Sequence, residues 1–226
     1  MHHYDSLLTQ AFNSLTGLHV PDYFVILIFV MLSTLAVFWL ATRKLSEDEP
    51  GWFQQILELA LETVGGFLDE IIGKEGRRFM PLIGTFAVLI LFSNLSGLVP
   101  GFMPPTGSII VTLSLGILSF LAYNLYGLVY KGFGWFKHFM GEVWWLAPLF
   151  VLIEIVSHLA RPMSLGVRLF GNISGDHAVG GVFLSLVPPL VPVAFTLLGI
   201  FVSFVQTLVF VLLSMIYLSE AAAEHH

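Results

Sequence analysis

The stretch from Phe79 to Tyr130 contains no Asp, Glu, Lys or Arg, and this lack of charge limits the possible folds more than any other feature of the sequence. Soluble domains contain roughly 25% charged residues, whereas this chain contains 11% and is 57% hydrophobic. A helix that crosses a bilayer core about 30 Å thick needs roughly 20 apolar residues. The uncharged stretch is long enough for two such helices, separated by the Pro- and Gly-rich segment from Pro100 to Ser108. We therefore expect an integral membrane protein.

Two further regions are apolar enough to enter a membrane, one before and one after this stretch. Tyr23 to Thr42 is uncharged, and Val143 onward is apolar but contains Glu154, Arg161, Arg168 and Asp176. We expect an all-α polytopic membrane protein, a single membrane domain over residues 1–226 with about five membrane helices and one interfacial helix. The expected elements are a first helix at 23–42, an interfacial amphipathic helix at 51–73, upright helices at 79–99 and 109–130, and a long tilted hairpin of helices at 143–187 and 190–220.

The distribution of basic residues predicts how the chain is oriented. The Lys and Arg residues near the expected membrane helices are Arg43, Lys44, Lys74, Arg77, Arg78, Lys131 and Lys137. By the positive-inside rule the joints that carry them are cytoplasmic, so the N-terminus is external and the C-terminus cytoplasmic. The first apolar run lacks a basic leader and is long enough to span, so we expect it to stay in place as an anchor.

The segment from Gly51 to Gly73 has apolar residues spaced as on one face of a helix, with its carboxylates mostly on the other side. Gly65 and Gly66 weaken this helix. It either lies on the cytoplasmic membrane interface or docks onto the helix bundle, and the pattern does not separate the two.

Polar residues follow a regular spacing in the region around Arg168. At about 100° per residue, one face of a helix would carry, within an arc of about 80°, the residues Glu154, Ser157, Arg161, Ser164, Arg168, Asn172 and Gly175. Hydropathy alone also allows a solvated loop from Arg161 to Asp176, but a loop has no reason to keep this register. An arginine at the centre of a membrane costs about 3 to more than 10 kcal/mol, so a membrane helix with this face needs a specific use for it.

The expected helix at 143–187 would be roughly 65 Å long, about twice the hydrocarbon thickness, and must be tilted or kinked. Pro162 is a possible kink point, and small residues at Ala160, Gly171 and Gly175 would let another surface approach closely. After the break at "VPPLVP" a second face repeats the pattern, with Thr196, Gly199, Ser203, Gln206, Ser214 and Tyr217. Folded as a hairpin, the two helices could set Arg168 against Gln206.

Two strings of residues together resemble a known family. "RPMSLGVRLFGN" (Arg161 to Asn172), followed by "FVQTLVFVLLSMIYLSEA" (Phe204 to Ala221), is similar to subunit a of the F-type ATP synthase, the stator channel subunit of its membrane motor. "FSNLSGLVPG" (Phe92 to Gly101) also resembles a segment of that family. The order of these strings, the chain length and the hydropathy profile extend the resemblance over nearly the whole sequence. The resemblance favours the membrane helix over the loop.

The resemblance implies the functional residues. Arg168 has the position of the family's essential ion-translocation arginine. The residues that it implies for the proton path and its support are Asn172, Gln206, Glu154, Ser157, His177 and Asn94. In some members a glutamate and a histidine occupy two positions of the inlet path. Here the first of these holds His177 and the second is assigned to Gly199, so the titrating relay group is left open.

Most of these residues also have an ordinary structural interpretation. Asn94 could form a helix-to-helix hydrogen bond, Glu154 could pair with Arg161 or His158, and Ser157 and Ser164 could be small packing residues. Arg161 could anchor its helix toward an interface. His177 falls on a different face from Arg168 in a regular helix, so its role requires a bend or a channel on that side.

The resemblance implies a mechanism in which the chain is a non-catalytic, proton-translocating subunit with two aqueous half-channels. A guanidinium is effectively always charged, so Arg168 would act electrostatically, ionising ring carboxylates and blocking a direct proton path. Asn172 and Gln206 would hold it by accepting hydrogen bonds. The coupled ion, proton or sodium, is left open because the ring supplies its binding carboxylate.

The implied surroundings follow from the same resemblance. The partners are the ring of c subunits, the peripheral-stalk b subunits, the lipid bilayer and, indirectly, the catalytic head, in a bacterial inner membrane; no nucleic acid, cofactor or metal is expected. The chain has no cysteine, which excludes disulfides and thiolate chemistry.

Two other functions are alternatives to this one. A secondary transporter would more usually show internal repeats. An intramembrane serine hydrolase using Ser174 would need a general base within hydrogen-bond reach, and no histidine follows in a membrane span after His177.

Overall fold

A computed structural model of the chain describes residues 6–43, 50–73, 75–99, 102–132, 147–186 and 190–222. Its α-helices are α1 (Leu7–Thr16), α2 (Asp22–Thr42), α3 (Trp52–Ile71), α4 (Met80–Ser96), α5 (Ile109–Lys131), α6 (Ala147–Leu186) and α7 (Leu190–Ala222), with 3-10 helices η1 (Gly76–Phe79) and η2 (Pro105–Gly107). The expected all-α polytopic membrane fold is confirmed, and the described residues contain no strand. The basic residues Lys44, Lys74 and Lys137, on which the predicted orientation partly rests, lie outside the described residues.

Four segments are long and apolar enough to cross a membrane: Asp22–Leu40, Gly76–Ser96, Ile109–Val129 and Val193–Ala222. They correspond to α2, to η1 with α4, to α5 and to most of α7. Two other long helices, α3 and α6, do not belong to this group. Helix α6 carries the charged residues Glu154, Arg161, Arg168 and Asp176. Hydropathy therefore identifies α2, α4, α5 and α7 as membrane helices. It does not explain why the long helix α6 carries charged residues.

The short helix α1 was not predicted from the sequence, although its ends carry typical capping residues. The Ser6 hydroxyl accepts a hydrogen bond from the Thr9 amide at the N-terminus, and Gly17 ends the helix with a φ of 69°, in the left-handed region. One carboxylate oxygen of Asp22, at the start of α2, accepts hydrogen bonds from the Ser6 amide, the Ser6 hydroxyl and the Thr9 hydroxyl. These contacts join α1 to the first membrane helix.

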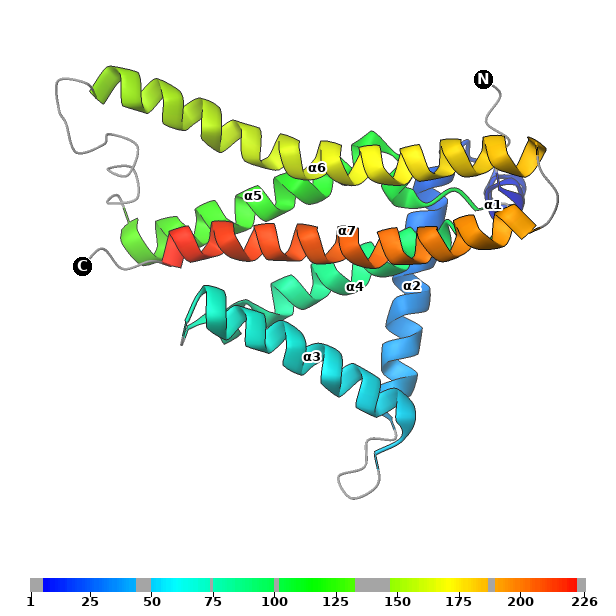
Figure 1. Cartoon of the computed structure of the whole chain (residues 1–226), viewed down its shortest axis with the longest axis horizontal. Coiled ribbons are helices and arrows are strands. Elements are labelled where there is room, and N and C mark those ends of the chain that lie inside the picture. Colours follow the sequence, from blue (N-terminus) through cyan, green and yellow to red (C-terminus); the bar gives the residue numbers. More distant parts are fainter. Residues whose placement is uncertain are drawn as a thin grey trace.

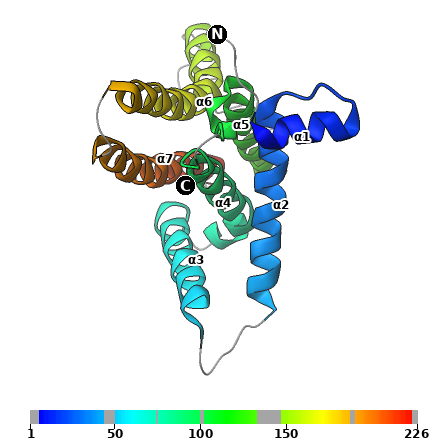
Figure 2. The same ribbon diagram turned by 90° about the vertical axis from the view of Figure 1, so that its right-hand side faces the viewer.

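Helices α6 and α7 form the long hairpin that the sequence predicted, and they run side by side in opposite directions (Figure 1). With 40 and 33 residues they are roughly 60 Å and 50 Å long, well beyond a bilayer core of about 30 Å. Helix α2 crosses their direction and lies on the other side of the molecule from the hairpin (Figure 2). If α2 stands across the membrane, the hairpin must lie strongly tilted within it.

The close packing of α5 against α6 depends on two glycines. A Cβ atom added to Gly116 would lie 2.4 Å from the carbonyl oxygen of Pro162, and one added to Gly166 would lie 2.9 Å from the Thr112 carbonyl oxygen. The two backbones are therefore in direct contact, as small residues allow between membrane helices. Pro162 lies inside α6, which changes direction partway along its length (Figure 1).

Helix α3 divides into two parts with different surroundings. Leu68, in its second half, is fully buried in a core cluster with residues of η1, α4, α5 and α7. The first half leads away from the bundle (Figure 1) and exposes the apolar side chains of Trp52, Ile56 and Leu59. Docking onto the bundle thus applies to the second half, and the exposed apolar side chains of the first half suit a membrane interface.

Candidate functional site

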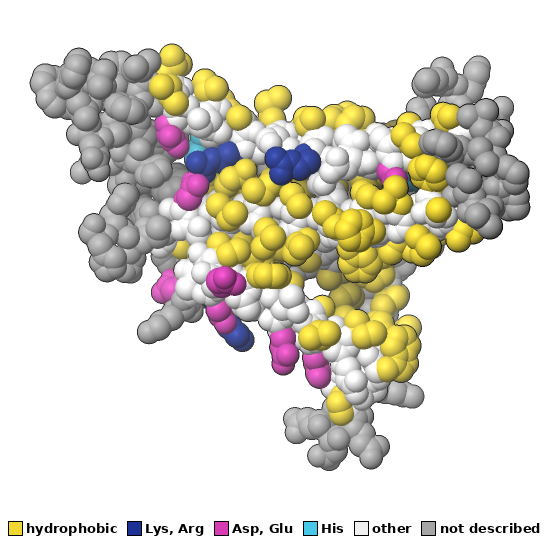
Figure 3. All heavy atoms as spheres, in the orientation of Figure 1, with side chains coloured by type: hydrophobic (Ala, Val, Ile, Leu, Met, Phe, Trp, Pro, Cys, Tyr) yellow, Lys and Arg dark blue, Asp and Glu magenta, His cyan; other side chains and the backbone are white. Residues whose placement is uncertain are grey.

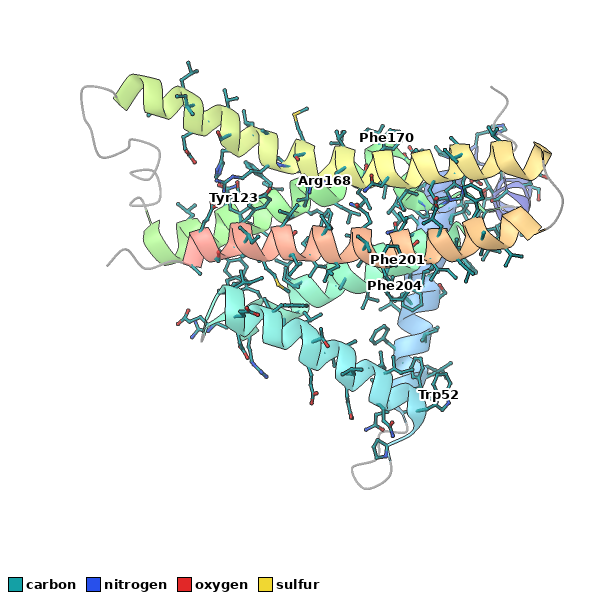
Figure 4. The ribbon with its side chains drawn as sticks, in the orientation of Figure 1. Trp52, Tyr123, Arg168, Phe170, Phe201 and Phe204 are labelled. Carbon is teal, nitrogen blue, oxygen red and sulfur yellow. The ribbon has the colours of Figure 1, made fainter. Side chains whose placement is uncertain are left out.

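Arg168 lies near the middle of α6 (Figure 4), and its side chain is exposed. The alternative of a loop from Arg161 to Asp176 is wrong, because α6 is one continuous helix over this region. The face predicted from helical periodicity is largely an outer surface: Ser157, Ser164, Arg168, Asn172 and Gly175 are exposed, and Glu154 and Arg161 are half-buried. The periodicity therefore identified a true face of the helix.

An apolar surface surrounds this charge. Exposed hydrophobic side chains flank the polar face of α6 and cover the outer side of α7; they are Leu159, Met163, Val167, Leu197, Phe201, Phe204 and Leu208. In the space-filling view two basic patches of α6 border a broad hydrophobic area on α7 (Figure 3). Among the described residues, the guanidinium of Arg168 has no hydrogen bond or ion pair. A permanent charge is thus presented without a counter-ion from the hairpin itself.

Asn172 and Gln206, expected to hold the guanidinium, instead bond to each other. The Asn172 side-chain amide nitrogen donates to the Gln206 side-chain oxygen, joining α6 to α7 one helical turn from Arg168. Gln206 is buried, with 3% of its surface exposed. The link fixes the spacing of the two helices beside the charge and leaves Arg168 on the outer surface.

Most polar residues of the face predicted on α7 lie inside the bundle, although Thr196 is exposed. Ser203, Gln206 and Ser214 are all buried, so the face predicted on α7 is not a second outer stripe. The hydroxyl of Ser119, on α5, donates to the Ser214 hydroxyl at 2.9 Å. The two polar faces of the hairpin therefore have different surroundings. The polar face of α6 is mostly exposed, whereas buried polar groups of α7 bond to α4 and α5.

Asn94 is the buried polar residue that connects α4 to α7. It is 3% exposed; its side-chain nitrogen donates to the Ser203 carbonyl at 3.5 Å, and its oxygen accepts from the Thr106 hydroxyl at 2.7 Å. The structural interpretation of Asn94 as a helix-to-helix hydrogen bond is thus seen in the structure. These bonds bring polar atoms of α4, η2 and α7 together inside the bundle.

His177 leaves α6 on the side of α4, as its helical position required. A Cβ atom added to Gly97 would lie 2.5 Å from the His177 Nε2 atom. His177 is exposed, and its imidazole lies close to the end of α4, one turn beyond Asn94. Ser174, one turn earlier on α6, donates from its hydroxyl to the Gly107 carbonyl at 3.3 Å, and this contact joins α6 to the turn before α5.

A second cluster of charges lies toward the C-terminal end of α7. Arg161 bonds to Glu220, approaches Glu154 at 3.9 Å and lies 5.2 Å from the ring centre of Tyr217. Pairing of Glu154 with Arg161 was one expected alternative, and the structure shows it at this longer distance. Glu220, which the sequence reasoning did not select, supplies the closer carboxylate.

Next to this cluster, His158 is 7% exposed and lies between two side chains of α5. Its Nε2 atom is 2.9 Å from both the Tyr123 hydroxyl and the Asn124 side-chain oxygen. These three residues were not predicted as a group. Two features of the sequence could have indicated this group. Tyr123 and Asn124 are adjacent polar residues in an uncharged span, and His158 lies three residues before Arg161.

We expect Arg161→Met to destabilise the membrane domain measurably. The substitution leaves Glu220 without its closest cation, and removing one partner of a poorly solvated pair costs roughly 1–3 kcal/mol when the pair is only partly buried. The readout is the melting temperature of the purified complex's membrane sector. Arg78→Met, which breaks an exposed pair with Glu75, is the matched control and should leave the melting temperature unchanged. Equal effects of the two substitutions would contradict this prediction.

The fold and this site define a polytopic membrane protein built around a long helical hairpin that presents an arginine without a partner among the described residues. Among the described residues no group of three or more His, Asp or Glu side chains is placed to hold a metal ion. The model of the ATP synthase A chain family matches residues 23–219, and the chain belongs to this family. The resemblance inferred from the sequence motifs is confirmed, and neither the transporter nor the serine hydrolase alternative is the family that matches.

Similar proteins cover most of this chain. It is 48% identical to ATP synthase subunit a 1 of Syntrophotalea carbinolica, over 87% of this chain and 84% of that protein. It is 44% identical to ATP synthase subunit a of Trichlorobacter lovleyi, over 87% and 85% of the two chains. For ATP synthase subunit a of Geobacter sulfurreducens the identity is 41%, over 87% and 86%.

Proposed function

We propose that this chain is the proton-translocating subunit of the membrane sector of an ATP synthase. The observation that carries the proposal is Arg168, a permanent charge exposed on an apolar surface without a partner among the described residues. Such a charge costs several kcal/mol in a membrane unless a counter-charge is supplied. A rotating ring of c subunits, each bringing a carboxyl group past Arg168, supplies it.

The chemistry at Arg168 is electrostatic. An opposite charge within about 4–6 Å favours the ionised form of a carboxylic acid, so a ring carboxyl that meets Arg168 releases its proton. The guanidinium itself keeps its protons and does not carry them. A proton that enters from one side therefore has to travel with the ring before it leaves on the other. Each charge that crosses a potential of 100 mV delivers about 2.3 kcal/mol, and several such steps drive rotation and ATP synthesis.

Two aqueous half-channels connect this site to the two sides of the membrane. Asn94 and His177 line the external one, because Asn94 is a buried polar group between α4 and α7 and the His177 imidazole lies close to Gly97, at the end of α4. Glu154 and Ser157 line the cytoplasmic one, on the first half of α6. Asn172 and Gln206 support the site between them by joining α6 to α7 beside Arg168.

The hairpin surface carries the contact with the ring, and the remaining helices anchor the subunit. The peripheral-stalk b subunits hold it fixed relative to the catalytic head. In this arrangement the protein lies in a bacterial inner membrane with its N-terminus external and its C-terminus cytoplasmic. The external placement of the turn before α5 agrees with the lack of charge in the whole stretch from Phe79 to Tyr130.

Single cysteines test which surface meets the ring, because the chain contains no cysteine of its own. Gly171→Cys places a thiol on the exposed face of α6, at a site where an added Cβ has no atom within 4 Å. Paired with a cysteine next to the ring carboxyl, it should form a disulfide with the ring in the assembled complex.

Leu35→Cys is the matched control. Leu35 is 65% exposed on α2, and this helix lies on the other side of the molecule from the hairpin (Figure 2). It should give no ring adduct. A ring adduct at Leu35 and none at Gly171 would reject the proposed orientation of the hairpin toward the ring.

A further inference from the structure

The short helix α1 exposes an apolar side at the place where the first membrane span begins. At about 100° per residue, Leu8, Ala11, Phe12 and Leu15 fall within an arc of about 100°. Ala11, Phe12 and Leu15 are exposed, and Leu15 has 87% of its surface accessible. Leu18, in the turn that follows the helix, is 60% exposed. Large apolar side chains of α1 are therefore presented to the surroundings of the chain.

Hydrogen bonds fix α1 to the beginning of α2. One Asp22 carboxylate oxygen accepts from the Ser6 and Thr9 hydroxyls, each at 2.6 Å, and Thr9 is fully buried. Further along α1, the Asn13 side chain donates to the Val20 carbonyl at 3.3 Å and accepts from the Val20 amide at 3.1 Å. These bonds lie on a different side of α1 from the exposed apolar residues. The orientation of α1 relative to α2 is therefore set near both ends of α1.

The position of α1 brings its apolar side next to the outer surface of a membrane span. This span starts at Asp22, the residue to which α1 is bonded, and 11% of it is buried inside the molecule. Helix α1 crosses the direction of α2 at this end (Figure 2). Phe24 and Ile28, the first exposed large apolar side chains of the span, lie within two turns of Asp22. A helix held across the start of a membrane span lies along the membrane surface, so the apolar side of α1 continues the apolar surface of α2.

The composition of α1 and its turn suits lipid better than water or a second protein chain. From Ser6 to Pro21 the sequence contains no Asp, Glu, Lys or Arg. The hydroxyls of Ser14 and Thr16 donate to carbonyl groups of α1 itself and are not directed at another chain. A helix without these charges binds a membrane through its buried apolar area and needs no anionic lipid.

We propose that α1 is an interfacial lipid-binding helix, whose apolar side enters the lipid leaflet on the side of the membrane where α2 begins. Its side chains occupy the region just below the headgroups, about 5–10 Å into the boundary between headgroups and acyl chains, as in other interfacial helices. The opposite side of α1, which carries Gln10, faces water. This contact with lipid is independent of proton translocation at Arg168.

Single labelled cysteines test which side of α1 meets lipid. The assembled complex, with reactive cysteines of its other subunits replaced, is reconstituted into phosphatidylcholine vesicles. Leu15→Cys carries a fluorophore on the apolar side, and Gln10→Cys, also exposed and about 140° around the helix, is the matched control. Lipids with a nitroxide just below the headgroup should quench the Leu15 probe roughly twofold or more than the Gln10 probe, because the apolar side lies at that depth. Iodide in the water should quench the two probes in the reverse order.

Two results would overturn the proposal. Equal quenching of both probes by iodide would place the apolar side of α1 in water. Protection of the Leu15 probe from both iodide and nitroxide lipid would mean that a protein covers this side. Neither result depends on pumping, so the proposed function is tested separately, and normal pumping by an Arg168 variant would reject that function alone.

Discussion

Arg168→Ala is expected to abolish ATP-driven proton pumping, with an initial rate at least about 100-fold below that of the unchanged complex. Removal of one preorganised electrostatic group typically lowers a rate by that much, and here the group is the only fixed charge at mid-hairpin among the described residues. Without the guanidinium, no nearby positive charge favours the ionised form of a ring carboxyl that reaches the hairpin, so this carboxyl keeps its proton. Passive proton leak should rise, because a cation no longer separates the two half-channels.

The control for this experiment is Arg43→Ala, which removes another exposed arginine. The guanidinium of Arg43 lies 3.5 Å from the ring centre of Trp39 at the end of α2, away from the hairpin. Pumping and leak should both stay normal in this variant, and the amount of assembled complex should match in all samples. Normal pumping by Arg168→Ala would show that another residue meets the ring carboxyl.

Arg168→Lys separates the charge of Arg168 from its shape. Lysine keeps a positive charge but is a compact ammonium that can lose its proton when poorly solvated, whereas guanidinium cannot. In this variant the leak should stay lower than in the alanine variant, because the barrier is a charge, while pumping should remain strongly reduced. The measurements are the passive leak and the initial pumping rate of the lysine and alanine variants, compared at equal amounts of assembled complex.

Much of the fold could be predicted from the sequence because membrane helices are defined by local composition. The lack of charge between Phe79 and Tyr130 indicated two spans, and the clustered Pro and Gly residues indicated the break between them. Helical periodicity also identified the outer face of α6, since residues one turn apart share a face whatever surrounds the helix. Helix α1 was missed because its ten residues are too few to give a hydropathy signal.

The surroundings of each face could not be predicted in the same way. Periodicity grouped Ser203, Gln206 and Ser214 correctly but could not show that they face the bundle, because that depends on where α4 and α5 pack. The contact of Arg161 with Glu220 joins residues far apart in sequence, and no local pattern connects them. Likewise the sequence showed that Gly199 lacks a side chain, but only the structure shows that the Asp176 carboxylate fills the space.

The glycines predicted to allow close approach illustrate the same limit. Gly171 and Gly175 were selected from the polar stripe, but an added Cβ at either position has no atom within 4 Å in the described structure. The glycines at a close helix crossing are Gly116 and Gly166, which lie between α5 and α6. This crossing fixes the position of the charge-bearing helix relative to its scaffold.

We therefore expect Gly116→Leu to prevent formation of the native hairpin. Even the first carbon of the new side chain would lie 2.4 Å from the Pro162 carbonyl oxygen, and that atom is backbone, which cannot turn aside as a side chain can. Separating the two helices loses the packing of Leu165 and Leu169 against α5 and α4, so the free energy of unfolding should fall by at least about 3 kcal/mol, the upper end of overpacking effects. The measurement is the melting temperature of the membrane sector together with the yield of assembled complex.

Gly84→Ala provides the matched control, since Gly84 is also inside a membrane helix but an added Cβ there has no atom within 4 Å. Its stability should be unchanged or higher by up to about 1 kcal/mol, because alanine favours a helix over glycine. Gly116→Ala should fall between the two, because it adds the one carbon that clashes and nothing more. Stability of Gly116→Ala equal to that of Gly84→Ala would mean that α6 can move away from α5 without loss, and the position of Arg168 would then not depend on this crossing.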